Sequence, residues 1–377
     1  MQPQRQAKPG LPPFADDSRH GGEHRTWIMP RGITLAHPGM EEGGYVPLAG
    51  GPFCFNQIDV LQRRDDRLSI SALPATALMD HAAAGGHDAE ALAGLVFDRL
   101  TRHRPSYAGH DCSRPVIMGI INTTPDSFSD GGDNAAAQTA IASGRRMAED
   151  GAVILDIGGE STRPGADPVS REEEEARIMP VIETLAGEGH TVSADTRHTA
   201  VMATAIAAGA AIINDVGGLR DDGAAQLLAE KNIPAMIMHM QGEPGTMQQN
   251  PCYDYAPTDV YDWLEARIDA VEAEGVPRSS LAIDPGFGFG KTPRHNMEIM
   301  GSLALYHGLG LPIVLGVSRK STIGHFSRGE AAKQRLPGSL ALAALGRQQG
   351  VQIFRVHDVD ETRQALALAE VMLTGGG

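Results

Sequence analysis

Short apolar runs alternate with longer amphipathic stretches from about residue 115 to the C-terminus. The apolar runs predict strands at residues 116–121, 153–157, 191–194, 211–213, 235–238, 281–283, 313–316 and 353–356. The amphipathic stretches predict helices at residues 135–150, 171–188, 199–208, 223–231, 260–274, 296–305, 339–349 and 359–373. Strands that alternate with helices imply a parallel sheet, and eight such units have the size of a closed (β/α)₈ (TIM) barrel. We therefore predict an α/β fold of this kind. An open doubly wound sheet is the alternative.

The first third of the chain has a different pattern. Residues 1–44 are rich in proline, glycine, histidine and charge without sustained periodicity, which predicts a flexible tail. Residues 45–113 predict a strand at 53–61 and an amphipathic helix at 88–102. We recognise no chemistry there and interpret this part as a small accessory N-terminal segment. The barrel then comprises residues 114–377.

Polar side chains stand at the C-terminal end of each predicted barrel strand, where barrels of this kind carry their chemistry. These residues are Asn122, Asp156, Asp195, Asn214, Asp215, His239, Asp284, the run Ser318–Ser321, and Arg355 with His357. Any one of them could be an ordinary loop residue or helix cap. Their recurrence at all eight strand ends predicts a functional site.

The side chains at the strand ends divide by charge. Hydrogen-bond acceptors suited to the N–H groups of a flat heterocycle come from Asp156, Asp195, Asn214 and Asp284. Cations and donors suited to a phosphate or diphosphate come from Lys320, Arg355, His357, Asn122 and Arg163. Barrels often bind phosphate near the loops after strands seven and eight. The sequence thus predicts a heterocycle half beside an anion half.

Two loops after the first and second strands are rich in glycine, proline, serine and aspartate. They comprise residues 123–132 and 158–165. Such loops can act as lids that exclude water from a reaction, or they can be ordinary turns.

Seven motifs in this order resemble those of the dihydropteroate synthase family of pterin-binding barrels. They are NTTPDSFSDGG (122–132), DIGGESTRPG (156–165), IINDV (212–216), MHMQG (238–242), DPGFGFGK (284–291), SRKS (318–321) and RVHDV (355–359). The resemblance extends from about residue 114 to the C-terminus. It implies an enzyme of folate biosynthesis that condenses 6-hydroxymethyl-7,8-dihydropterin diphosphate with 4-aminobenzoate by a Mg²⁺-assisted, SN1-like substitution. It also implies a homodimer.

The resemblance also implies roles for individual residues. Asp195, Asn214, Asp284 and Lys320 would hold the pterin, with Asp156 supporting that pocket, and Arg355 and His357 would bind the diphosphate. Asn122 would ligate Mg²⁺, Thr162 and Arg163 would contact substrate, and Phe128 and Pro164 would line the aminobenzoate pocket. Ser318 would receive the aminobenzoate carboxylate, and Phe289 and Lys291 would shape the floor. Asn122, Lys320, Arg355 and His357 would be the residues closest to the chemistry.

Composition excludes several other classes of protein. A net charge of −15 argues against general binding to nucleic acid or to an anionic membrane, and no apolar run approaches the length of a membrane span. Three widely spaced cysteines argue against a disulfide scaffold or a zinc ribbon and favour a cytoplasmic location.

Three alternative functions remain to be compared with the synthase. A nucleotide triphosphatase would need a P-loop. The sequence GKT at 290–292 resembles the end of one, but Pro285 stands where the first glycine of the motif is required. A corrinoid-linked methyltransferase would use a related pterin-binding barrel without a diphosphate, which the SRKS and RVHDV motifs disfavour. A catalytically inactive pterin-binding protein would not need Asn122, Lys320, Arg355 and His357 together.

Overall fold

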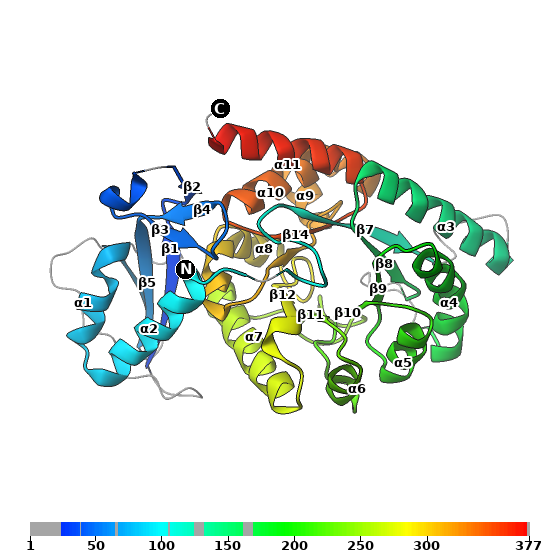
Figure 1. Ribbon diagram of the computed structural model, residues 1–377, viewed down its shortest axis with the longest axis horizontal. Helices are drawn as coiled ribbons and strands as arrows, with labels where there is room; N and C mark the ends of the chain where they lie inside the picture. The colour runs from blue at the N-terminus through cyan, green and yellow to red at the C-terminus, as the bar shows by residue number, and fades with distance from the viewer. Residues whose placement is uncertain are drawn as a thin grey trace.

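The computed structural model describes residues 24–37, 39–64, 67–104, 106–123, 132–160 and 169–374 (Figure 1). Eight parallel strands form a barrel: β7 (Val116–Asn122), β8 (Ile154–Gly158), β9 (Val192–Asp195), β10 (Ile212–Asp215), β11 (Ala235–Met238), β12 (Leu281–Asp284), β13 (Val314–Leu315) and β14 (Ile353–Val356). Neighbours pair in the order β12-β11-β10-β9-β8-β7-β14-β13, and a parallel bridge between Ile283 and Ile313 joins the two ends. The predicted TIM barrel is confirmed, and an open sheet is excluded by this closure.

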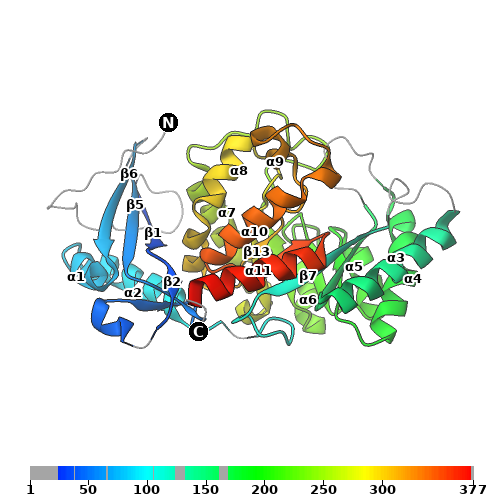
Figure 2. The same cartoon turned by 90° about the horizontal axis from the view of Figure 1, so that it is seen from above.

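Helices surround the barrel, as Figure 2 shows. They are α3 (Gly132–Asp150), α4 (Arg171–Gly187), α5 (Thr199–Ala207), α6 (Ala224–Lys231), α7 (Ala256–Ala273), α8 (Pro293–Met300), α10 (Leu336–Gln348) and α11 (Val359–Thr374), with the short α9 (Ser321–Phe326). The predicted helix 296–305 is in fact α8 followed by a 3₁₀ segment, Leu303–Leu309. None of the helices in the described part of the chain is both long and apolar enough to span a membrane.

The barrel interior has an apolar layer below a polar layer. One cluster of buried side chains contains Met118, Ile154, Ile212, Met236, Ala282, Val314 and Ile353. Two residues further along three of these strands stand Asp156, Asn214 and Arg355. Successive side chains of a strand point to opposite faces, so residues two apart share the barrel interior. This period places polar groups at the C-terminal mouth and leaves the lower interior apolar.

The lower end of the barrel is closed by the segment that leads into it. Tyr107 and Cys112 are buried in the same cluster as the lower strand residues. Tyr107 and His110 form an antiparallel bridge, and the His110 Nε2 atom lies 3.2 Å from the Thr191 hydroxyl. Residues 107–112 therefore plug the barrel opposite its mouth.

Residues 24–101 form a second folded unit with a core of its own. One sheet has the antiparallel order β1 (His24–Arg31), β5 (Gln57–Arg64) and β6 (Arg67–Pro74), and a smaller one has β2 (Thr34–Leu35), β4 (Phe53–Phe55) and β3 (Val46–Leu48). Two helices, α1 (Leu78–Ala83) and α2 (His87–Thr101), complete this N-terminal domain.

The structure corrects the prediction of a flexible tail at residues 1–44 for the described part of that range, residues 24–37 and 39–44. Strand β1 pairs with β5 along its whole length, and Trp27 and Met29 on it are buried. The apolar run that forms β1 is short and contains Pro30, so it has no periodic signal, and its partner is distant in sequence. Residues 1–23 lie outside the described residues. The predicted strand 53–61 is two strands in different sheets, and the predicted helix 88–102 is confirmed as α2.

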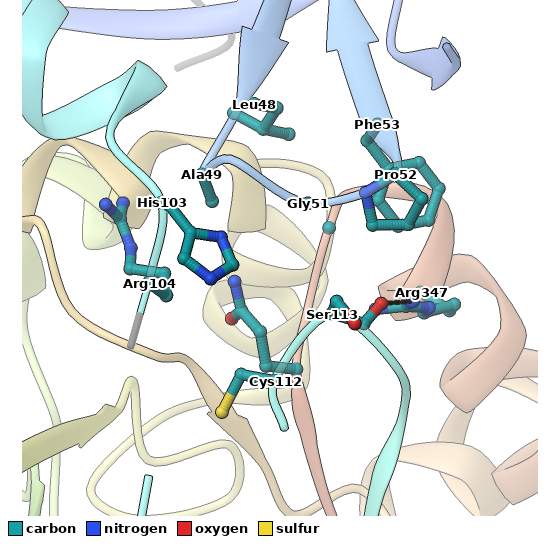
Figure 3. A pocket seen from close by; sticks show the side chains of 12 residues that line it. Leu48, Ala49, Gly51, Pro52, Phe53, His103, Arg104, Cys112, Ser113 and Arg347 are labelled. Atoms are coloured by element: carbon teal, nitrogen blue, oxygen red, sulfur yellow. Dashed lines mark hydrogen bonds between the residues drawn. The ribbon is translucent and has the colours of Figure 1, made fainter. Parts of the chain in front are cut away.

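A small cavity lies where the N-terminal domain meets the lower end of the barrel (Figure 3). Leu48, Ala49 and Phe53 line it from one side, and Cys112 and Arg347 line it from the other. Its volume of about 10 Å³ is room for about one water molecule. The cavity therefore belongs to domain packing and cannot hold a substrate.

The plug at the lower end gives the first prediction. The Tyr107 hydroxyl is buried without a hydrogen-bond partner among the described residues, and burial raises its pKa well above the usual value. Tyr107→Phe removes that unsatisfied group and keeps the ring, so we expect the free energy of unfolding to rise by about 1 kcal/mol. Tyr107→Ala leaves a cavity and should lower it by about 3–5 kcal/mol. Urea titrations measure both. A large loss in Tyr107→Phe would show that the hydroxyl has a stabilising partner.

Candidate active site

Arg355 stands at the centre of the mouth and binds two carboxylates. Its Nε atom donates to Asp156 Oδ2 at 2.6 Å, and its Nη2 atom donates to Asp195 Oδ2 at 2.5 Å. The Asn214 amide donates to the same Asp156 oxygen at 3.2 Å. These four side chains come from β14, β8, β9 and β10 and form one connected polar group.

Burial controls the protonation of this group. Asp156 is fully buried, and its Oδ1 atom has no hydrogen-bond partner among the described residues. Burial raises the pKa of Asp195 to about 7, with Arg355 opposing the shift and Asp156 adding to it. The arginine thus keeps two nearby carboxylates together, and the group retains unused acceptors that suit a ligand rich in N–H donors.

Asp284 and Lys320 lie on the next part of the mouth. The Gly286 N–H donates to Asp284 Oδ1 at 2.7 Å. Burial raises the pKa of Asp284, whereas the nearby charge of Lys320 lowers it. The Lys320 ammonium lies 4.0 Å from the centre of the Phe289 ring, a cation–π distance. Phe289 therefore forms an apolar wall that holds the lysine beside the acceptors.

Lys291 has a structural role below this wall. Its ammonium lies 2.8 Å from His239 Nδ1 and donates to the carbonyls of Gly286 and Phe289, both at 2.9 Å. Gly286 has a φ of +70°, and a Cβ there would lie 1.9 Å from the His239 carbonyl oxygen. The loop that carries Phe289 is thus fixed on the end of β11, which fits the predicted role of Lys291 in shaping the floor.

Ser318 and His357 form a pair and do not offer two independent groups. The Ser318 hydroxyl oxygen accepts from the His357 N–H at 3.2 Å and lies 3.0 Å from His357 Nδ1. Burial, with Arg319 and Arg355 nearby, lowers the pKa of His357 to about 3. His357 is therefore neutral at pH 7, and within the predicted set of cations and donors it acts as a donor. Donation from the Ser318 hydroxyl to Nδ1 would place the ring proton on Nε2, where it can be donated to a ligand.

Ser318 lies three residues before a helix and is not part of it. Helix α9 begins at Ser321, with Lys320 as its N-cap. Ser318 is only 5% exposed, whereas Ser321 is exposed directly beside Lys320. Both serines belong to the SRKS motif, and sequence spacing alone could not distinguish the buried one from the exposed one.

Of the remaining candidate residues, the structure describes only Asn122. Asn122 is half-buried at the end of β7, beside Gly158, with which it pairs. Phe128, Thr162, Arg163 and Pro164 lie outside the described residues. In the described parts of the chain, no three His, Cys, Asp or Glu side chains gather as a metal cluster would require.

Glu174 is a buried acid that the sequence interpretation missed. It is 1% exposed, and neither carboxylate oxygen has a hydrogen-bond partner among the described residues, although Thr196 lies close. Burial raises its pKa to about 7, and nearby Glu160 adds to the shift. Glu174 belongs to an acidic run in the first turn of α4, which Ser170 caps, and acidic residues favour this position whether or not they are buried. However, Glu174 also lies one helical turn before the buried Ile178, a spacing that predicts burial.

Comparisons with known proteins identify the family of the chain. The family described as pterin binding enzyme matches residues 118–357. Dihydropteroate synthase of Escherichia coli (strain K12) is 44% identical over 265 residues, covering 70% of this chain and 94% of the relative. That of Neisseria meningitidis serogroup B (strain ATCC BAA-335 / MC58) is 48% identical over 265 residues, covering 69% and 93%.

Solved structures give the same result. Dihydropteroate synthase from Xanthomonas albilineans in complex with 7,8-dihydropteroate superposes with a TM-score of 0.64 at 42% identity, covering 69% of this chain and 94% of that one. A Yersinia pestis dihydropteroate synthase with a sulfonamide drug complex gives 0.67 at 43% identity, covering 70% and 96%.

The chain belongs to the pterin-binding enzyme family, and it shares the fold of the solved dihydropteroate synthases. Within that family it is an enzyme of the dihydropteroate synthase group, which acts in folate synthesis.

The buried acid gives the second prediction. Glu174 has a higher pKa in the folded state than its usual 4.5, so the folded state binds the proton more tightly. Its contribution to stability is full below pH 4.5 and is lost as pH rises through 7. Glu174→Gln should therefore be more stable than the parent protein at pH 8, by up to about 3 kcal/mol, and similar to it at pH 4.5.

Chemical denaturation at the two pH values measures this difference. Glu172→Gln, an exposed change in the same helical turn, is the matched control and should show no pH-dependent difference. Equal effects of Glu174→Gln at pH 4.5 and pH 8 would contradict a raised pKa.

Proposed function

We propose that the enzyme joins 6-hydroxymethyl-7,8-dihydropterin diphosphate to 4-aminobenzoate, with release of 7,8-dihydropteroate and diphosphate. The observation that carries the proposal is the group formed by Arg355 with Asp156, Asp195 and Asn214 at the mouth. The complexes of the Xanthomonas albilineans enzyme with 7,8-dihydropteroate and with 4-aminobenzoic acid support it.

The acceptors on β9, β10 and β12 bind the pterin ring in this proposal. Asp195, Asn214 and Asp284 offer oxygens to ring and amino N–H groups, and Asp156 supports them from below. The raised pKa of Asp195 lets this side chain bind as a carboxylate or as an acid. Lys320, held over Phe289, offers a donor to the acceptor atoms of the ring.

The leaving diphosphate requires positive charge and N–H donors. The C–O bond of the pterin methylene breaks with its electron pair on the diphosphate, and the electron-rich ring delocalises the cation that remains. Arg355 offers its guanidinium, and the neutral His357 offers Nε2–H. Separation of charge at this bond is the main barrier that these side chains lower.

Mg²⁺ fits this site only as a partner of the diphosphate. Asn122 supplies one amide oxygen, the donor type that Mg²⁺ prefers, and this ion keeps several waters. The ion would neutralise charge on the leaving group when bound. Among the described residues, Asn122 is the only one that we propose as a ligand of Mg²⁺.

The aniline nitrogen then forms the new N–C bond and loses a proton to solvent or diphosphate. It is largely neutral at pH 7, so it needs orientation and no strong base. We assign its carboxylate to the exposed Ser321 and no longer to Ser318. Phe128, Thr162, Arg163 and Pro164 remain proposed contacts from the two loops, which exclude water from the cation.

We also propose that the enzyme is a homodimer in the cytoplasm. Leu345 on α10 and Leu368, Val371 and Met372 on the adjacent α11 are each at least half exposed. A group of exposed apolar side chains on two neighbouring helices is typical of a protein interface. All three cysteines are free thiols, which suits a reducing compartment.

The test of the reaction is diphosphate release by the purified enzyme with both substrates and Mg²⁺, and dihydropteroate is identified by mass. Lys320→Ala should weaken binding of the pterin substrate by about 10- to 100-fold, because a charged hydrogen bond in a half-buried site is lost. Lys333→Ala, an exposed lysine on a neighbouring 3₁₀ turn, is the control. Pterin binding without diphosphate release would favour an inactive binding protein, and unchanged affinity in Lys320→Ala would remove this residue from the site.

The dimer has its own prediction. The chain has a mass of 39.9 kDa, so light scattering should give twice this value. Leu368→Asp places a charge on the apolar face of α11 and should yield monomers, whereas Met79→Asp on α1 should not. A monomeric parent protein, or a Leu368→Asp variant that stays dimeric, would contradict this interface.

A further inference from the structure

The N-terminal domain contacts the barrel through arginines that face an acidic side of α7. The ion pairs are Arg25 with Asp262 and Glu265, Arg63 with Asp259, and Arg99 with Glu265, at 2.6–3.2 Å. Trp27 adds a hydrogen bond from its indole to Asp262 at 2.7 Å, and the Arg63 guanidinium lies 5.2 Å from its ring centre. Figure 1 shows the domain beside α7.

Arg63 differs from the other arginines because its partner stands at the start of the helix. Asp259 Oδ1 accepts from Arg63 at 2.6 Å, and its Oδ2 accepts from the backbone N–H groups of Asp254 and Tyr255 at 2.8 and 3.2 Å. The first N–H groups of a helix have no partner within it, and Tyr255, the N-cap, provides no side-chain cap. Arg63 thus fixes the Asp259 carboxylate, which binds the last backbone N–H groups of the loop between β11 and α7.

That loop packs directly on the loop that follows β12. The Tyr253 hydroxyl donates to the Gly290 carbonyl at 2.7 Å, and the Gln248 amide donates to the Gly288 carbonyl at 2.9 Å. A Cβ on Gly290 would lie 2.5 Å from the Gln241 carbonyl oxygen, so the two backbones are in contact. A shift of one loop must displace the other.

Phe289 lies between these two glycines, and it is the residue over which Lys320 stands. Its ring also packs with Met238, Met240 and Met247 from β11 and the loop after it. Asp259 therefore connects Arg63 to the backbone of Asp254, which follows Tyr253 in the chain. Tyr253 in turn binds the carbonyl of Gly290, which follows Phe289, the residue under the lysine of the mouth.

We propose that Arg63 is a positioning residue, through which the N-terminal domain sets the place of Phe289 and Lys320 in the active site. The inference rests on the proposed function for the role of Lys320. The family match begins at residue 118, so this contribution comes from a part of the chain outside the family's own domain.

The experiment compares Arg63→Ala with Arg99→Ala in the full chain. Both lose an ion pair of the same interface, but Glu265 lies in the middle of α7, far along the helix from its start. Hydrogen exchange of the segment 240–255 should increase in Arg63→Ala and stay unchanged in Arg99→Ala. The KM for the pterin diphosphate should rise about 3- to 10-fold in Arg63→Ala alone, as the loss of one hydrogen bond's free energy predicts, with kcat changed less.

A second variant keeps the test decisive if Arg63→Ala does not fold. Asp259→Asn retains an oxygen acceptor for the backbone N–H groups but removes the charge that Arg63 binds, and it should give the same exchange and KM changes. Arg63→Lys should restore part of the effect. Equal responses of Arg63→Ala and Arg99→Ala, or no response in either, would overturn the inference. An inactive parent protein would instead overturn the proposed reaction, and the exchange measurement would still decide whether Arg63 orders the loop.

Discussion

Two carboxylates at the mouth of the barrel are held together by one arginine. Asp156 and Asp195 come from neighbouring strands and point into a space from which water is largely removed, and Arg355 bonds to both. Without it, two like charges would be buried together, which is strongly destabilising. With it, the strands can present oxygen acceptors to a ligand while the fold remains stable.

The same interaction determines where the acceptors and the cations of the site lie. The sequence predicts a half with acceptors for a heterocycle beside a half with cations and donors for an anion. Arg355 instead stands among the acids, and His357 is neutral because its surroundings are buried and already positive. The acceptors for a heterocycle and the donors for a departing diphosphate are therefore adjacent, and a ligand that spans both can use the arginine as their common member.

Much of this site could be predicted because parallel strands impose simple rules. Side chains two residues apart on a strand share one face, which places Asp156 above Ile154 and Arg355 above Ile353. The position of a polar residue at the end of a strand therefore predicts that it lies at the mouth. The Ser318–His357 pair depends on which face of a short turn is buried, and no local pattern encodes that. The burial of Glu174 can be predicted from the sequence, because Glu174 lies four residues before the buried Ile178 on the same helix face. Strand β1 cannot be predicted in this way, because its apolar run is short and its partner β5 is distant in sequence.

The pairing of Arg63 with Asp259 spans 196 residues of chain, which has a consequence for how the protein is made. At ribosomal rates of about 5–20 residues per second, the arginine leaves the ribosome roughly 10–40 s before its partner. The synthesis of the whole N-terminal domain, which has a core of its own, is completed during that interval. Arg25, Arg63 and Arg99 stay exposed to solvent until α7 is synthesised, so the newborn domain presents this cationic face for longer than most folding steps require.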